Sequence, residues 1–307
     1  MTLPLLMVSQ IQRSGGSLMA QLFDGHPQLH AHPFEIQIGY PKKWNWPSLN
    51  LDGPPAEWFE LLYEKKLDEF IVGGYKKPGS NPHAHREVFA FNFDKHQFRE
   101  AFERRLQETP PSSARVILNV YFEEFFSAWL DHTTTGHEKF VSGFTPRLFM
   151  MDPLLQGFHA DYPDGFGLSV IRDPKSWYAS SSRHSGSYSD PDKALDEWAH
   201  STRASLALQK QFPERFKCLL FRDLIGETAQ TMQQVCLFAG IDYVNSLTEP
   251  TFLGEAVFPN SSFEIDKKGI NQDMLDRDSS LTPEALATIE DKARPLYDEA
   301  VASCALS

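Results

Sequence analysis

Short apolar runs recur along the chain, and a turn and then a helical pattern follow each of them. Four of these runs predict buried strands: residues 3–8, 140–144, 166–171 and 216–221. Amphipathic patterns predict the main helices: residues 16–23, 174–185, 193–211, 227–239 and 283–302. Alternation of strand and helix is typical of a parallel sheet covered on both faces. The pattern therefore predicts an α/β fold with a central, mainly parallel β-sheet flanked by helices.

One long stretch, residues 26–115, does not follow this alternation. It is rich in proline, histidine and tryptophan, and it holds three lysine pairs, at residues 42–43, 65–66 and 76–77. We expect loops mixed with two helices, at residues 57–68 and 95–107. Because the chain has no internal repeat and no interdomain linker, we expect one domain over residues 1–307, with residues 40–115 as an insertion or lid.

Composition narrows the functional classes. With 41% hydrophobic and 23% charged residues, the 307-residue chain can bury a large core. The 29 basic against 41 acidic residues give 29 − 41 = −12, which disfavours a nucleic-acid partner or an anionic membrane surface. The sequence shows no secretory signal and no run near the roughly 20 apolar residues of a spanning helix. Three widely spaced cysteines predict no disulfide framework, so we expect a cytoplasmic protein.

The turn after the first strand carries the strongest chemical signal. It reads Arg13-Ser14-Gly15-Gly16-Ser17 and leads into an apolar helix start. Backbone N–H groups of such a turn can hold a phosphate, and the glycines let the backbone approach it closely. The serines can donate hydrogen bonds and Arg13 adds positive charge. The pattern predicts an anion site, although a strand–helix turn without any ligand remains an alternative.

This loop differs from the phosphate loop of common ATPases and kinases. A Walker A loop has the form G-x-x-x-x-G-K-S/T. Here Ser9 or Gln10 replaces its first glycine, and Gly16 replaces its lysine. The difference disfavours an ordinary ATP-dependent enzyme.

A second motif follows the strand expected at residues 166–171. Arg172 stands at the end of that strand, Pro174 suits the first helical position, and Ser180 comes about two helical turns later. Both polar side chains can therefore face one anion at the sheet edge where ligands of open α/β sheets bind. Arg172 as a helix-start ion pair and Ser180 as a surface serine are the alternative.

Together, the two motifs resemble the sulfotransferases that use 3′-phosphoadenosine 5′-phosphosulfate (PAPS). In that family a K/R-S/T-G-x-S/T loop holds the 5′-phosphosulfate, and an R-x-P-x-x-x-x-x-S segment holds the 3′-phosphate. Shorter similarities occur in Phe221-Arg222-Asp223-Leu224 and Asn260-Ser261-Ser262-Phe263. The resemblance implies these PAPS-binding residues: Arg13, Ser14, Gly15, Gly16, Ser17, Leu18, Arg172, Ser180, Lys267, Lys268 and Gly269. For the last three, a solvated turn is the alternative.

The resemblance also implies a reaction. A sulfuryl group passes from PAPS to a hydroxyl, or less readily to an amine, and 3′-phosphoadenosine 5′-phosphate (PAP) is released without a metal ion. Arg13 would neutralise the leaving phosphate. In the family, a glutamate in an H-P-x-x-x-x-x-x-E context often takes the acceptor's proton. In this chain seven residues stand between His26-Pro27 and Glu35, one more than in that pattern. The resemblance implies Glu35 as the base, with His32 as second candidate, while an exposed loop carboxylate and a loop histidine are the alternatives.

The chain departs from the family near its central strand. Many members carry lysine or histidine beside a T-P-R segment, whereas this chain has Phe144-Thr145-Pro146-Arg147. Either Arg13 supplies all the positive charge at the bridging oxygen, or another residue such as Arg147 or a lysine of residues 40–115 contributes. A metal site at His30/His32 and His83/His85 is disfavoured, because no cysteine or acidic ligand pattern accompanies them.

Residues 40–115 are expected to determine the acceptor. Their lysine pairs lie beside Trp44, Trp46, Trp58 and Tyr75, which suggests a saccharide or glycolipid acceptor. In the alternative interpretation these aromatic side chains form the core of the insertion. Two other functions remain open: an ATP-dependent phosphotransferase and a non-catalytic nucleotide-binding protein.

Overall fold

The computed structural model of the chain describes residues 3–38, 46–75, 88–275 and 281–304. Its strands are β1 Leu5–Val8, β2 Leu29–Glu35, β3 Phe140–Phe144, β4 Phe166–Ile171, β5 Phe216–Leu220, β6 Thr251–Phe252 and β7 Glu255–Ala256. Its α-helices are α1 Gly16–Leu22, α2 Pro55–Leu62, α3 Lys66–Gly73, α4 Lys95–Glu108, α5 Ala114–Ala128, α6 Asp152–Asp161, α7 Pro174–His184, α8 Pro191–Gln211, α9 Phe221–Gly226, α10 Thr228–Ala239, α11 Pro283–Lys292 and α12 Arg294–Cys304. None of the helices in these ranges is long and apolar enough to cross a membrane.

Five parallel strands form the central sheet in the order β2-β3-β1-β4-β5. The chain passes from β1 outward to one side for β2 and β3, and then to the other side for β4 and β5. In open α/β sheets, ligands bind at the carboxyl ends of the strands where the strand order reverses in this way. The predicted α/β fold with a mainly parallel sheet is confirmed, and the reversal point lies at the carboxyl end of β1.

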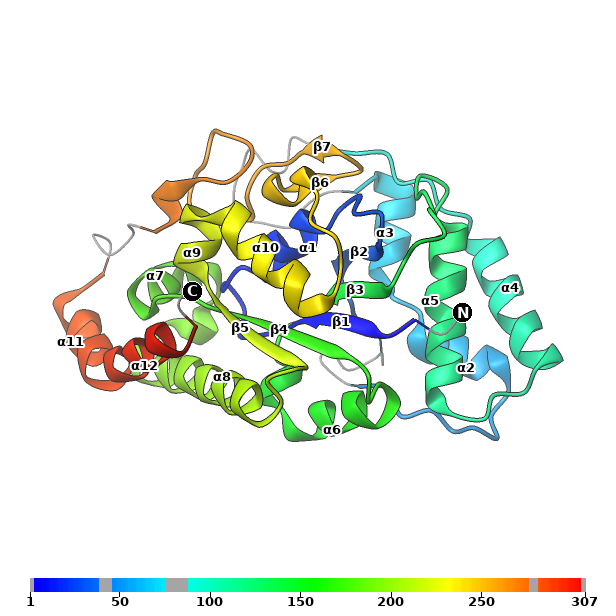
Figure 1. The fold of residues 1–307 in the computed structure, drawn as a ribbon, viewed down its shortest axis with the longest axis horizontal. Helices are drawn as coiled ribbons and strands as arrows, with labels where there is room; N and C mark the ends of the chain where they lie inside the picture. The colour runs from blue at the N-terminus through cyan, green and yellow to red at the C-terminus, as the bar shows by residue number, and fades with distance from the viewer. Residues whose placement is uncertain (1–2, 39–45, 76–87, 276–280, 305–307) are drawn as a thin grey trace.

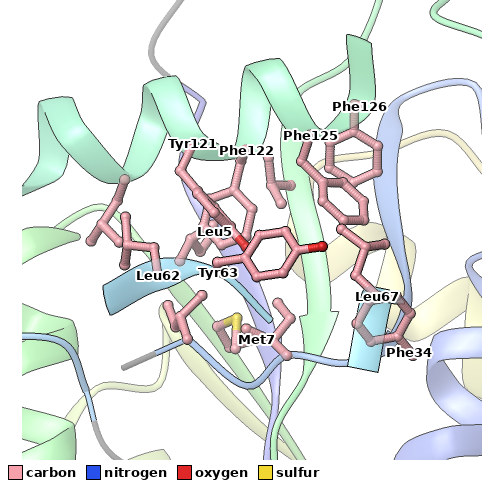
Figure 2. Packing of buried hydrophobic residues seen from close by; sticks show 14 of the residues in the cluster. Leu5, Met7, Phe34, Leu62, Tyr63, Leu67, Tyr121, Phe122, Phe125 and Phe126 are labelled. Atoms are coloured by element: carbon pink, nitrogen blue, oxygen red, sulfur yellow. The ribbon is translucent and has the colours of Figure 1, made fainter. Parts of the chain in front are cut away.

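Helices cover both faces of this sheet (Figure 1). Side chains of β1 alternate between the two faces, as the strand period of two requires. Leu5 and Met7 pack in one cluster with α5 and α6, whereas Leu6 and Val8 pack in another with α1 and α10. Figure 2 shows aromatic side chains of α5 above Leu5 and Met7. Burial on both faces explains why these strands are almost continuously apolar.

The helices of the 40–115 stretch belong to the same hydrophobic cluster as β1 and α5. Phe59 of α2 and Phe98 of α4 lie 5.1 Å apart between ring centroids, and both are fully buried. Trp58 is also buried, and its indole N–H donates to the Asn50 carbonyl oxygen at 2.7 Å. The Trp46 ring packs edge-on against Phe158. These aromatic side chains therefore pack the 40–115 stretch together and against α6.

Two helices expected to be continuous are each divided, so those two predictions were wrong. The expected helix at 57–68 is interrupted at Tyr63, which takes an extended conformation with ψ 123°. This turn lets the buried Glu64 carboxylate face His32 of β2. The expected helix at 283–302 breaks at Ala293, because Pro295 has no N–H to donate and its ring excludes a continuous turn.

Strand β2 lies within the stretch where no strand was expected. Pro33 stands inside it, and the pairing of β2 with β3 shifts in register between Ala31 and Glu35. A sheet edge tolerates proline because one side of the strand needs no ladder hydrogen bonds. Helices α5 and α6 were likewise not predicted. Strand β2 ends at Glu35, the residue expected to be the base.

Candidate active site

A cavity of about 440 Å³ opens at the carboxyl ends of the central strands. It brings together many of the residues that the sequence singled out, from segments more than 250 positions apart. The sequence-predicted residues that line it are Arg13, Gly15, Gly16, Ser17, Leu18, Glu35, Arg172 and Gly269. The other lining residues include Gln12, Gln21, Gln37, Lys66, Phe144, His184, Phe221, Asn260, Ile270 and Met274.

The loop after β1 has no room for side chains at its two glycines. Gly15 has a φ of +107°, and a Cβ there would lie 2.9 Å from the Phe221 ring. A Cβ on Gly16 would overlap the Phe144 ring and the side-chain amide of Gln10. Both positions therefore require glycine, and the loop presents its backbone to the cavity.

Arg13 reaches from this loop to a distant segment of the chain. Its backbone is left-handed, with a φ of 68°. Its Nε donates to Ser180 Oγ at 3.3 Å, and its Nη1 and Nη2 donate to the side-chain and backbone oxygens of Asn260 at 3.2 and 3.3 Å. The Asn260 amide in turn donates to Ser17 Oγ at 3.3 Å. Asn260 thus holds both ends of the loop while lining the cavity.

Arg172 follows β4 and is only 3% exposed. Its Nη1 donates to the Arg13 carbonyl oxygen, and its Nη2 to that of Met274, both at 3.0 Å. Its Nε donates to Ser176 Oγ at 3.1 Å, and the guanidinium lies 4.5 Å from the centre of the Phe221 ring. A buried cation is therefore fixed by acceptors from three segments while it lines the cavity.

The predicted serines Ser14 and Ser180 are buried and are not among the lining residues of the cavity. Besides its contact with Arg13, Ser180 Oγ lies 3.4 Å from Ser262 Oγ. Ser180 is therefore placed next to the cavity and behind the Arg13 side chain.

The three residues of the predicted basic turn lie differently from one another. Gly269 has a φ of +83°, lines the cavity, and its N–H donates to the Val257 carbonyl oxygen at 3.0 Å. Lys267 and Lys268 are exposed and are not among the lining residues. The Lys268 ammonium lies 5.8 Å from the centre of the Phe258 ring.

The two candidates for the base are separated by the fold. Glu35 lines the cavity, and its carboxylate accepts a hydrogen bond from the Gln37 amide at 3.4 Å. His32 lies in the core, where Nδ1 contacts the Phe34 carbonyl oxygen at 2.9 Å and Nε2 contacts Glu64 at 3.1 Å. Both ring nitrogens of His32 have protein partners, so Glu35 is the candidate that faces the cavity.

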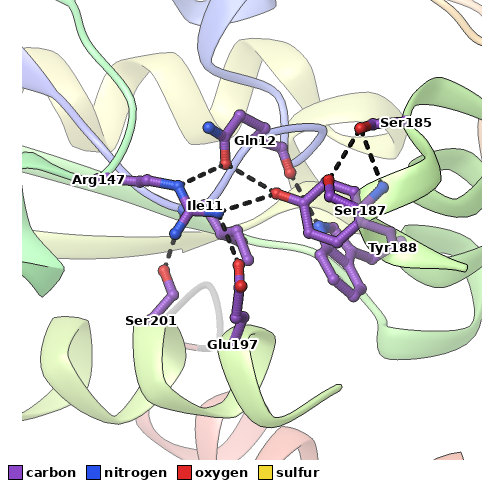
Figure 3. Close-up of polar contacts among 9 residues, drawn as sticks. Ile11, Gln12, Arg147, Ser185, Ser187, Tyr188, Glu197 and Ser201 are labelled. Carbon is purple, nitrogen blue, oxygen red and sulfur yellow. Dashed lines mark hydrogen bonds and ion pairs between the residues drawn. The ribbon is translucent and has the colours of Figure 1, made fainter. Parts of the chain in front are cut away.

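A polar network supports the backbone of the loop after β1 from the side of α8 (Figure 3). Gln12 accepts hydrogen bonds through Oε1 from Arg147 Nε at 3.1 Å and from the Tyr188 hydroxyl at 3.0 Å. Arg147 also pairs with Glu197 at 2.6 Å. The guanidinium is thus held against Gln12 and α8, and Arg147 is not among the residues that line the cavity.

The neighbouring backbone is fixed as well. The Ile11 N–H donates to Ser201 Oγ at 3.0 Å, and the Trp177 indole N–H donates to the Gln12 carbonyl oxygen at 2.9 Å. The path of the loop before Arg13 is therefore determined by Arg147, Tyr188, α7 and α8.

Histidines outside the cavity form a separate contact. His30 Nδ1 lies 2.9 Å from His132 Nε2. Within the described ranges, no three or more His, Cys, Asp or Glu side chains are grouped to hold a metal ion. His83, His85 and Trp44 lie outside the described residues.

Sequence reasoning did not identify Lys66 and Asn260 as individual site residues. Lys66 begins α3 and, like Glu35, lines the cavity. The sequence marks it only as one member of the lysine pair at residues 65–66. Asn260 belongs to the segment Asn260-Ser261-Ser262-Phe263, whose resemblance to the family assigns no role to this residue. Both come from loops or helix starts, where no hydrophobic pattern predicts the spatial neighbours.

Comparison with known proteins identifies sulfotransferases, the family that the sequence motifs resemble. The sequence model of the sulfotransferase family matches residues 55–245, which is more than half of the chain. This segment includes the Arg172 motif and begins after the loop at residues 13–17. No curated protein sequence matches the chain.

Two solved structures share its fold. A sulfotransferase domain from the curacin biosynthetic pathway is 14% identical, with a TM-score of 0.52 over 94% of this chain and 96% of that one. A sulfotransferase domain from the Synechococcus PCC 7002 olefin synthase is 16% identical, with a TM-score of 0.53 over 94% and 93%. At these identities the likeness establishes the fold.

Proposed function

The chain belongs to the sulfotransferase family, and on that premise we propose that it transfers a sulfuryl group from PAPS to a hydroxyl of an acceptor and releases PAP. One observation carries the proposal: Arg13, Arg172 and Glu35 line a single cavity at the carboxyl end of β1. These side chains offer two cations for a highly charged nucleotide and one carboxylate for the acceptor's proton.

The two arginines suit the two ends of the donor. In this proposal Arg13, the loop backbone and Ser17 hold the 5′-phosphosulfate, because a glycine loop lets N–H groups approach phosphate oxygens closely. Arg172 meets the 3′-phosphate, and Ser180 joins it once the Arg13 side chain turns toward the donor. Lys267 and Lys268, next to Gly269, reach the same phosphate from the solvent side.

The reaction then requires positioning and charge stabilisation. The acceptor oxygen forms a bond to sulfur while the bond from sulfur to the 5′-phosphate oxygen breaks, and Glu35 takes the acceptor's proton. Arg13 and the loop N–H groups stabilise the negative charge that grows on the leaving phosphate. No step in this scheme uses a metal ion.

Many family members carry a lysine or histidine beside the T-P-R segment, and this chain has none at Thr145. We propose that Lys66 supplies the missing positive charge. Arg147 is directed toward Gln12 and Glu197. Lys66, in contrast, lines the cavity beside Glu35 and comes from the insertion. Its ammonium can stabilise charge on the sulfuryl oxygens as the group passes to the acceptor.

The proposal extends to organisation and location. We propose one catalytic domain in which residues 40–115 form the acceptor side, because Lys66 of this stretch lines the cavity. The free thiols of Cys218, Cys236 and Cys304 support a reducing compartment, for which the cytoplasm is proposed.

Calorimetry distinguishes this function from the two alternatives. The chain should bind PAP without added metal and more tightly than AMP, which lacks the 3′-phosphate. A preference for ATP with magnesium would favour a phosphotransferase. Tight PAP binding without turnover of PAPS toward any alcohol, saccharide or amine would favour a non-catalytic binding protein.

A further inference from the structure

A second, smaller cavity of about 80 Å³ adjoins the first at Glu35. The two cavities share a rim formed by Ser17, Gln21, Glu35, Lys66, Phe144 and Asn260. We call the smaller one the branch cavity. Its rim therefore contains the proposed base and a residue of the phosphate loop, which is where an acceptor hydroxyl must lie for transfer.

Beyond this rim the walls are apolar or aromatic. They are formed by Ala20 of α1, Pro33 and Phe34 of β2, and Tyr75. The Phe34 ring packs against Phe70 with centroids 5.0 Å apart, and the Tyr75 ring stacks on Phe252 at 3.8 Å. Because neighbouring rings hold both walls, the branch cavity has a fixed shape.

The walls carry no charge at neutral pH. Tyr75 is the one wall residue beyond the rim with a titratable group, and burial, with Asp24 nearby, raises the pKa of its hydroxyl. A buried hydroxyl of a ligand would meet carbon at Ala20, Pro33 and Phe34, and an unpaired buried hydroxyl is unfavourable. The chemistry beyond the rim therefore favours an alkyl group.

Two of the aromatic side chains that suggested a saccharide, Trp46 and Trp58, pack within the fold away from the cavities. The Trp46 indole donates to Asp161 at 2.7 Å, and the buried Trp58 indole donates to the Asn50 carbonyl oxygen. Neither lines the large cavity or the branch cavity. The described part of the insertion thus offers Lys66 and Tyr75 to the acceptor.

Resting on the proposed function, we propose that the branch cavity is the acceptor subsite and that it takes the alkyl chain of a short primary alcohol. Since a water-sized group needs about 10–15 Å³, the cavity holds on the order of five carbon atoms. The alcohol oxygen lies at the rim and attacks sulfur. Its proton passes to Glu35, and the sulfur–oxygen bond to PAP breaks.

A series of unbranched alcohols from ethanol to heptanol tests the subsite in the wild-type chain. With PAPS at saturation, mass spectrometry of the alkyl sulfates gives kcat/KM for each alcohol. The value should rise about fourfold per added methylene as apolar surface is buried, up to about five carbon atoms, and then level off. Values that stay flat, or a preference for glycerol or glucose, would overturn the proposal.

A filled branch cavity gives an independent test. Ala20→Leu should lower kcat/KM for pentanol at least tenfold, change that for ethanol by less than twofold, and leave the affinity for PAP unchanged. Ala229→Leu, at an exposed position of α10, is the matched control and should change none of these values. Equal losses for ethanol and pentanol, or no loss for either, would contradict the proposal.

Failure of this inference is distinguishable from failure of the proposed function. If PAP binds and no alcohol of the series reacts, the acceptor class is wrong and the donor site stands. If PAP does not bind more tightly than AMP, the proposed function itself falls.

Discussion

The Nη1 atom of Arg172 donates a hydrogen bond to the backbone carbonyl oxygen of Arg13, over 3.0 Å. The residue proposed for the 3′-phosphate therefore also holds the loop proposed for the 5′-phosphosulfate. Because the Arg13 backbone is left-handed, this loop needs such external support. The two ends of the proposed donor site are therefore one connected structure.

Replacing Arg172 should damage both ends of that site. Arg172→Ala is expected to weaken PAP binding by about 2–5 kcal/mol, the range for losing one partner of a desolvated charge pair. AMP should lose less, because it has no 3′-phosphate. Calorimetry with both nucleotides checks this, and an equal loss for the two would show that Arg172 does not meet the 3′-phosphate.

Replacing Glu35 should separate chemistry from binding. Glu35→Gln is expected to lower kcat by about 10²–10⁴, the usual contribution of a general base, with the affinity for PAP unchanged. Glu69→Gln, an exposed glutamate of α3, serves as the matched control. Pre-steady-state transfer rates give the comparison. A Glu35→Gln enzyme with the wild-type rate would require another base.

The His32–Glu64 pair should act on stability. Both side chains are fully buried, and Glu64 also accepts a hydrogen bond from the Gln37 N–H at 2.7 Å. His32→Leu leaves a buried carboxylate without its partner and should cost about 3–5 kcal/mol in the free energy of unfolding. In urea denaturation, the double variant with Glu64→Leu should be more stable than His32→Leu alone. A double variant at or below that single variant would argue against a buried charge as the cause.

Arg147 is expected to affect nucleotide binding indirectly, by holding Gln12 in the loop that precedes Arg13. Arg147→Ala removes the hydrogen bond to Gln12 and should weaken PAP binding by about 1 kcal/mol, the usual net value of one such bond. The exposed pair with Glu197 contributes little. Arg203→Ala, at an exposed position of α8, is the control. If Arg147→Ala abolished transfer without changing nucleotide affinity, Arg147 would have a direct catalytic role.

Acid should destabilise the chain through His132. Burial, and then the neighbouring His30, lower the pKa of His132 to about 4. An unfolded histidine titrates near pH 6.5, so this contribution to stability is complete above that pH and is lost as the pH falls toward 4. About 2 kcal/mol is expected, allowing for partial exposure.

His132→Phe keeps the ring contacts with Phe126 and Trp129 and removes this titration. In urea denaturation between pH 4 and 7, the free energy of unfolding should then depend less on pH for the variant than for the wild type. His137→Gln, at an exposed position, should leave the wild-type profile intact. The same pH dependence of stability for His132→Phe and wild type would show that His132 is not the group that destabilises the chain in acid.

Much of the fold could be predicted because buried parallel strands leave apolar runs with sharp ends. The expected strands at 140–144 and 166–171 are confirmed as β3 and β4 with the same bounds. Strand β2 was missed because an edge strand tolerates Pro33 and alternating histidines. The divided helix at 57–68 depends on the buried Glu64, and a local pattern cannot show that a carboxylate has a partner in β2.

The cavity could be predicted where local turn chemistry defines it, as at Gly15 and Gly16. Asn260 and Lys66 were missed because their roles depend on tertiary neighbours. Asn260 contacts Arg13 across 247 positions of sequence. No spacing rule connects segments so far apart.

Sulfuryl transfer is tested by incubating the chain with PAPS labelled in its sulfuryl group, without added metal, across a panel of primary alcohols, saccharides and amines. Labelled sulfate ester, or sulfamate from an amine, and PAP should form in equal amounts. Arg13→Ala should abolish both products, and Glu35→Gln should slow their formation by about 10²–10⁴. No labelled ester or sulfamate from any acceptor, together with phosphate transfer from ATP and magnesium, would contradict sulfuryl transfer from PAPS.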